Sequence, residues 1–152
     1  MKRIIIISLT VFCLAFIISC GNKSSNNKVI TINAGPQPQT IDPSINTSLD
    51  SCYYVIHAFE GLTKLDSNNN VVGAVAEGWF ISDDGLKYTF HLRTNAKWSD
   101  GKPITANDFE YSWKRTVNPN VAAEYAYMME FVKNAKEINA GIMDYNNLGV
   151  KA

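Results

Sequence analysis

The spacing of hydrophobic residues changes along the chain, and each spacing predicts a different element. Val29–Ile32 is a β-branched run that predicts a short strand, which ends before the prolines of the segment 36–38. Thr40–Pro43 has the composition of a turn. Over residues 49–59 the apolar positions lie three to four residues apart, which predicts a helix closed by Gly61.

Two hairpins are predicted next. Residues 62–65 and 71–72 enclose an Asn-rich turn, and residues 76–81 and 88–92 enclose the turn at 82–85. The last of these runs alternates apolar and polar residues, as a half-buried strand does. The turn at 99–101, Ser-Asp-Gly, follows.

The C-terminal third predicts two amphipathic helices. Thr105 and Asp108 form a capping-box pattern at the start of the first, and Asn118-Pro119 ends it. The second helix is predicted to end near Gly141. Its apolar face consists of Met128, Phe131, Val132, Ala135 and Ile138.

The first residues have the pattern of a bacterial export signal. Lys2 and Arg3 precede an uncharged apolar run of about 15 residues, which is shorter than the ~20 residues of a membrane span. Small residues then lead to Cys20, as in the lipobox of bacterial lipoproteins. We therefore predict a signal peptide over residues 1–19, acylation of Cys20, and a polar tether over residues 20–28 that holds the protein at the membrane.

Composition restricts the function. The 152 residues carry 14 basic and 14 acidic groups, which excludes a strongly basic surface for nucleic acid. No phosphate loop, nucleophile elbow or metal-binding motif is present, so we predict no catalytic residues, no metal and no cofactor. After cleavage Cys52 is the one cysteine without an acyl chain, so no internal disulfide is predicted.

Three alternatives in this chain have a simpler structural interpretation. Cys52 and His57 lie close in sequence, but we predict a small buried thiol and a polar helix residue instead of a nucleophile and its base. The turn at 66–70 partly matches a calcium loop, although Val71 replaces the required glycine. The tryptophans are predicted to be core residues, and they are Trp79, Trp98 and Trp113.

Two segments resemble a known family. Phe-Glu-Gly-Leu at 59–62 and the block 88–115, which includes Lys-Trp-Ser-Asp-Gly at 97–101, are similar to the oligopeptide-binding proteins of bacterial ABC importers. These are extracellular solute-binding proteins of family 5. The resemblance extends from about Ile30 to Ala152.

The resemblance implies an α/β fold, the two-lobe clamp of periplasmic binding proteins, of which this chain holds the N-terminal part. Residues 29–59 are then the first segment of the ligand-binding lobe, and residues 60–152 are most of an extra α/β domain. Family members are several-fold longer, so we expect this sequence to be a fragment.

The family also implies where a ligand binds. The residues that match the segment lying beside a bound peptide are Thr47, Ser48 and Leu49, which would pair with it through the backbone. Tyr125 matches a tyrosine that faces the cleft. Some relatives have an acidic residue where this chain has Thr47, which leaves the preference for ligand charge open.

These residues predict a monomeric substrate-binding lipoprotein outside the cell, without catalytic activity. It would capture oligopeptides and deliver them to the permease subunits of an ABC importer. A dipeptide-, nickel- or pheromone-binding member of the same family is the first alternative. An exported hydrolase and a purely structural surface lipoprotein are alternatives from other classes.

Overall fold

The computed structural model describes residues 29–33 and 35–152. The predicted signal peptide, Cys20 and the tether lie outside these residues. The chain divides into two units, Met1–Asn33 and Ala34–Ala152, and each is considered by itself. Val29–Ile32 forms no strand, so that prediction was wrong. A strand needs a partner for its ladder of hydrogen bonds, and the described residues of the first unit supply none.

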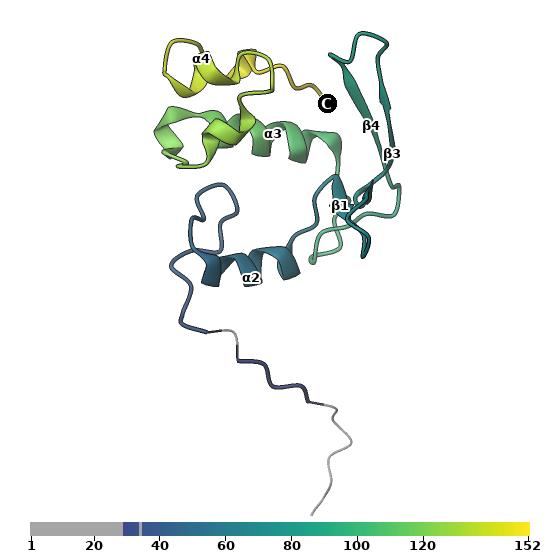
Figure 1. Cartoon of the computed structure of the whole chain (residues 1–152), viewed down its shortest axis with the longest axis vertical. Coiled ribbons are helices and arrows are strands. Elements are labelled where there is room, and N and C mark those ends of the chain that lie inside the picture. The colour runs from purple at the N-terminus through teal and green to yellow at the C-terminus, as the bar shows by residue number, and fades with distance from the viewer. Residues whose placement is uncertain (1–28, 34) are drawn as a thin grey trace, which may run out of the picture. The chain divides into compact units, whose positions relative to one another are not determined.

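The second unit combines short helices with two hairpins (Figure 1). In chain order its elements are α2 (Leu49–Ala58), β1 (Thr63–Leu65), β2 (Val71–Gly73), β3 (Ala76–Ile81), β4 (Tyr88–Leu92), α3 (Ala106–Val117), the 3-10 helices η1 (Pro119–Val121) and η2 (Ala126–Met129), α4 (Ala135–Asn139) and the 3-10 helix η3 (Tyr145–Asn147).

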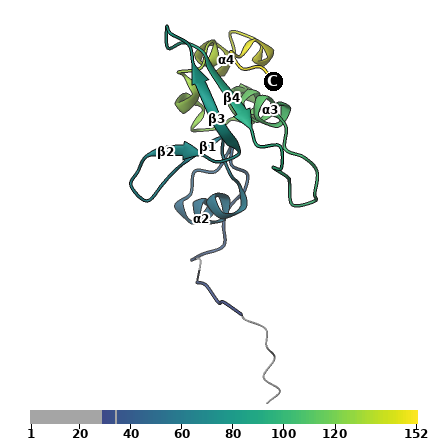
Figure 2. The ribbon, with the colours of Figure 1, turned by 90° about the vertical axis from the view of Figure 1, so that its right-hand side faces the viewer.

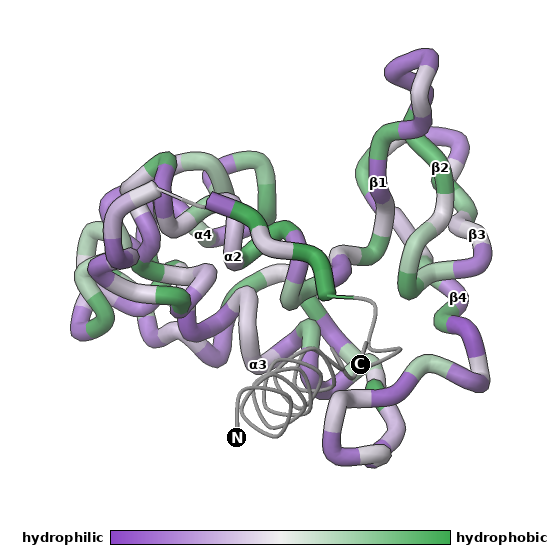
Figure 3. Tube along the Cα trace, turned by 90° about the horizontal axis from the view of Figure 1, so that it is seen from below, coloured by the Kyte–Doolittle hydropathy of each residue, from purple (hydrophilic) through white to green (hydrophobic). Residues whose placement is uncertain are grey.

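Both predicted hairpins form (Figure 2). Strands β1 and β2 are antiparallel, with Lys64 opposite Val72, and β3 and β4 are antiparallel, with Trp79 opposite Phe90. The turn of the first hairpin is hydrophilic (Figure 3). In it the Asp66 carboxylate accepts the backbone N–H groups of residues 68 and 70 at 2.8 and 2.9 Å. These bonds stabilise the Asn-rich turn.

The hydrophobic core of the second unit lies between α3, α4 and the segment of η3. Val117 and Ile138 are fully buried, and Ala135 and Leu148 join them. Trp113, which was predicted to be a core residue, packs against this cluster and is partly buried. Figure 1 shows α3 and α4 side by side. Helix α3 begins and ends as predicted, with a capping box at its N-terminus and Asn118 as its C-cap.

The second amphipathic helix was predicted as one element, and this was wrong. The segment forms the 3-10 helix η2 and the short helix α4, separated by irregular backbone. Asn134 stands at the break in the left-handed conformation with φ 68°, and its side chain donates to the carbonyl of Asn147 at 2.7 Å. Phe131, which the periodicity assigned to the apolar face, is 98% exposed.

Two other expectations need correction: the burial of Trp98 and the end of the helix predicted over residues 49–59. Trp98 is 42% exposed because it lies in the turn closed by the bridge between Lys97 and Pro103, whereas Trp79 is half-buried against Phe90. Helix α2 forms where predicted but ends at Ala58.

The face of α2 that the pattern marks as apolar is exposed as well. The fully buried residue of this helix is Ser51, on another side. The exposed residues of the apolar face are Leu49, Tyr53, Ile56 and Phe59.

Candidate functional site

The segment before α2 is a turn fixed by its own polar groups. The Thr40 hydroxyl accepts the N–H of Asp42 at 3.1 Å, and the Asp42 carboxylate accepts the N–H of Ser44 at 3.0 Å. The Asp42 carbonyl accepts the N–H of Asn46 at 3.0 Å. The predicted turn at 40–43 is therefore confirmed, and it continues to Asn46.

The predicted backbone site follows this turn directly. Ser48 is the N-cap of α2 in extended conformation, with φ −96° and ψ 136°. Its N–H donates to the side-chain oxygen of Asn46 at 3.0 Å, and its carbonyl accepts the N–H of Cys52 at 3.1 Å. The backbone of Ser48 is thus already engaged within the chain. Leu49 is 74% exposed.

Thr47 differs from its neighbours. Within residues 29–33 and 35–152, neither its N–H nor its carbonyl has a hydrogen-bond partner, and the residue is exposed. Backbone polar groups are strong donors and acceptors that are paired with protein or water in folded proteins. Of the three predicted residues, Thr47 is therefore the one whose N–H and carbonyl both lack a hydrogen-bond partner within the described chain.

The turn is attached to α3 by an ion pair. Arg115 donates from its two terminal nitrogens to the two carboxylate oxygens of Asp42, at 2.9 and 2.6 Å. Both side chains are about one-third exposed. The Arg115 guanidinium lowers the pKa of Asp42 below its ordinary value of 3.8, although burial acts in the opposite direction, and the pairing raises the pKa of Arg115. The Thr116 hydroxyl adds a bond to Ser44 Oγ at 3.2 Å.

Tyr125 lies at the start of η2. It is 46% exposed, and its ring meets that of Tyr127 edge-on, with centroids 6.0 Å apart and an interplanar angle of 66°. Helix η2 contacts α3, the same helix that holds the turn before Thr47. Within the described chain no hydrogen bond or ring contact joins Tyr125 to residues 47–49.

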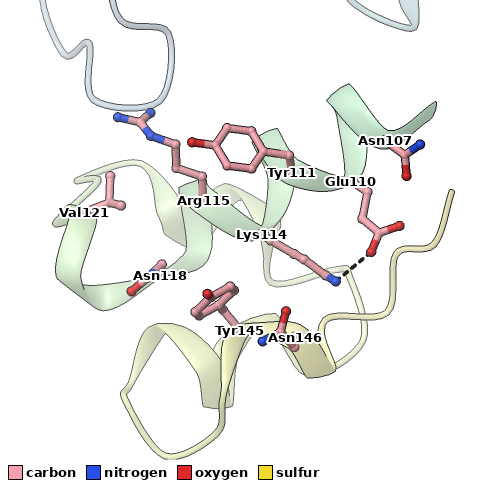
Figure 4. Close-up of a pocket in the computed structure, with 9 residues that line it drawn as sticks. All are labelled: Asn107, Glu110, Tyr111, Lys114, Arg115, Asn118, Val121, Tyr145 and Asn146. Carbon is pink, nitrogen blue, oxygen red and sulfur yellow. Dashed lines mark hydrogen bonds and ion pairs between the residues drawn. The ribbon is translucent and has the colours of Figure 1, made fainter. Parts of the chain in front are cut away.

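An open groove of about 460 Å³ lies between α3 and the η3 segment (Figure 4). None of the four predicted ligand residues lines it. Its charged groups are already paired: Lys114 donates to Glu110 at 2.6 Å, and Arg115 is held by Asp42. The groove therefore offers no uncompensated charge for a ligand.

The structure contains little that suggests catalysis or metal binding. Among the residues it describes, no group of three or more His, Cys, Asp or Glu side chains is placed to hold a metal ion. The Nδ1 atom of His57 lies 2.6 Å from the carbonyl oxygen of Tyr53, inside its own helix, and Cys52 is half-buried. Nor does the described part contain a helix both long enough and apolar enough to span a membrane.

Sequence reasoning did not identify Asp42 and Arg115 as partners. The Asp-Pro pair predicted a turn, but 73 positions separate the two residues, and no local periodicity relates them. The one signal in the sequence was the positive charge of Arg115 on the predicted helix. The neighbouring Lys114 carries the same charge, so the sequence could not show which of the two pairs with Asp42.

Comparison with known proteins defines the class. Residues 70–148, about half of the chain, match the model of the bacterial extracellular solute-binding proteins, family 5 Middle. The dipeptide-binding protein of Lactococcus lactis is 42% identical over 155 residues, which is 100% of this chain and 28% of that protein. The probable deoxycholate-binding periplasmic protein YgiS of Escherichia coli is 41% identical over 127 residues, covering 82% and 24%.

A solved structure agrees with this assignment. The crystal structure of Haemophilus influenzae OppA in complex with RPPGFSPFR superimposes with a TM-score of 0.74 and 38% identity, over 79% of this chain and 24% of that one. The predicted mixed α/β fold class is confirmed. The chain belongs to the family 5 bacterial extracellular solute-binding proteins, and it spans about a quarter of the length of these relatives.

Proposed function

We propose that this chain is part of a substrate-binding protein that captures oligopeptides outside the cell and delivers them to the permease of an ABC importer. Its family consists of solute-binding proteins, and one similar structure holds a nonapeptide. The observation that carries the proposal is the backbone of Thr47, which has no hydrogen-bond partner among the described residues and lies between an anchored turn and the start of α2.

A peptide would pair with this segment as an added strand. Every non-proline peptide residue offers the same N–H and carbonyl, so backbone pairing accepts many sequences. The N–H and carbonyl of Thr47 supply the complementary pair, and Ser48 and Leu49 follow directly in the chain. The Tyr125 ring and hydroxyl would contact the ligand from η2, where almost half of the side chain is exposed.

The binding site is tested in the complete gene product with the peptide RPPGFSPFR, by titration calorimetry. Thr47→Pro removes the donor and should weaken binding by about 1–3 kcal/mol, or roughly 5- to 150-fold. Thr47→Ala keeps the backbone and should bind almost as tightly as the unmodified protein. Hydrogen exchange should also show that peptide protects the Thr47 amide. Equal affinity for the proline and alanine variants, with both folded, would exclude this backbone site.

We further propose that the protein is a monomer held at the outer face of the cell membrane by acylated Cys20, after removal of residues 1–19. The order of charged residues, apolar run and lipobox supports this. Cys20→Ala should abolish labelling with radioactive fatty acid and release the protein from the membrane. Labelling that persists in the variant contradicts the anchor.

A dipeptide ligand is the alternative that one observation favours, because the Lactococcus lactis relative is a dipeptide-binding protein. Competition of dialanine against RPPGFSPFR distinguishes the two. A hydrolase would cleave the bound peptide, whereas a binding protein releases it intact, which mass spectrometry of the recovered peptide decides.

A further inference from the structure

A series of hydrogen bonds connects α3 to the candidate ligand segment. It begins at Arg115, whose guanidinium holds both oxygens of the Asp42 carboxylate at 2.9 and 2.6 Å. Asp42 in turn accepts the N–H of Ser44 through its side chain and the N–H of Asn46 through its carbonyl. The Asn46 side chain then accepts the N–H of Ser48 at 3.0 Å.

This series leaves one amide unbonded. From Asp42 to Ser48, each residue with an N–H donates it within the described chain, apart from Thr47. Thr47 therefore lies between two residues whose backbones are held, while its own donor and acceptor have no partner within the described chain. A polar group fixed in this way needs little reordering when it binds, which favours affinity.

Arg115 supplies the strongest contact in the series. A bidentate pair between arginine and a carboxylate is stronger and more directional than a neutral hydrogen bond. It also comes from another element, whereas the other bonds of this series join residues close in sequence. Without it, the Thr116–Ser44 hydroxyl contact would be the one remaining hydrogen bond between the turn and α3 among the described residues.

We propose that Arg115 is a positioning residue for ligand binding: through Asp42 it fixes the turn that presents the backbone of Thr47. This inference rests on the proposed function, because it assumes that Thr47 pairs with the ligand. In this proposal Arg115 acts through Asp42 and does not itself contact the ligand.

The test uses the complete gene product and two measurements, hydrogen exchange without ligand and titration with RPPGFSPFR. Arg115→Met should speed exchange at the amides of Ser44, Asn46 and Ser48 by roughly tenfold, and leave β3 and β4 unchanged. It should weaken peptide binding roughly 5- to 50-fold. Arg115→Lys retains the charge and should recover part of both effects.

Two further variants separate positioning from general stability. Lys114→Met removes the neighbouring cation, which is paired with Glu110 instead of the turn, and should change neither measurement at residues 44–48. Asp42→Asn keeps an acceptor for Ser44 but loses the charge. The double variant Asp42→Asn with Arg115→Met should bind no more weakly than Arg115→Met alone, because both changes break the same contact.

Each result has one meaning. Unchanged exchange at residues 44–48 in Arg115→Met overturns the inference, as does faster exchange spread over the whole protein. Faster local exchange with unchanged affinity also overturns it, while the proposed function stands. If the unmodified protein does not bind the peptide, the proposed function fails and the positioning role fails with it.

Discussion

Helices α2 and α3 carry apolar residues at similar spacing, but they bury them to very different extents. In α3, Val117 is fully buried and Trp113 packs against the core formed with α4. In α2, Leu49 is 74% exposed and Ile56 is 59% exposed. An amphipathic pattern therefore identifies a helix and its apolar face, whereas burial depends on whether another element packs against that face.

The largest expected effect distinguishes the core that α3 forms with α4 from the exposed face of α2, by one matched substitution in each. Ile138→Ala removes a fully buried side chain from the core beside α3 and should cost about 2–5 kcal/mol of unfolding free energy. Ile56→Ala, on the exposed face of α2, should cost less than about 1 kcal/mol. Urea unfolding of the two variants measures the difference.

Equal losses for these two variants would show that the face of α2 is covered in solution. Measuring the unfolding free energies of Ile138→Ala and Ile56→Ala in the complete gene product sharpens the test. If additional chain packs on α2 there, the cost of Ile56→Ala should rise toward that of Ile138→Ala.

The local elements followed from the sequence because short-range chemistry determines them. The capping box at Thr105 and Asp108, the stop at Asn118, and the two hairpin turns were all predicted correctly. The break at Asn134 was missed, since its cause is a left-handed residue tied to Asn147, a contact that apolar periodicity does not contain.

The site was predictable only in part. Resemblance to a family pointed to residues 47–49, but not to the fact that the Ser48 amide is bonded to Asn46 and the Thr47 amide is not. The pairing of Asp42 with Arg115 depends on the tertiary fold, because it joins a turn to a helix far along the chain.

The next effect concerns the N-termini of the same two helices. Asp108 accepts the backbone N–H of Thr105 at 2.7 Å, so Asp108→Ala should destabilise the protein by about 1 kcal/mol. Ser48, the N-cap of α2, makes no side-chain capping bond, and Ser48→Ala should cost a few tenths of a kcal/mol. Thermal unfolding compares them, and a larger loss for Ser48→Ala would contradict the capping geometry.

The smallest effect tests the contact that joins the turn before α2 to α3. Because Arg115 lowers the pKa of Asp42 in the folded state, the folded protein releases this proton more readily than the unfolded chain. The stabilisation is therefore fully present above the ordinary pKa of 3.8 and is lost as the pH falls through the lower, folded value. For a pair whose side chains are about one-third exposed, we expect about 0.5–1 kcal/mol.

Asp42→Asn isolates this contribution. The other carboxylates with lowered pKa values, Asp66, Asp84, Asp100 and Glu110, titrate in both proteins and cancel in the difference. The unfolding free energy of the unmodified protein minus that of Asp42→Asn should be constant from pH 7 to about pH 5 and decrease below about pH 4. A difference that stays constant down to pH 3 would mean that Asp42 is not paired with Arg115 in solution, and that the turn before α2 is held to α3 by other contacts.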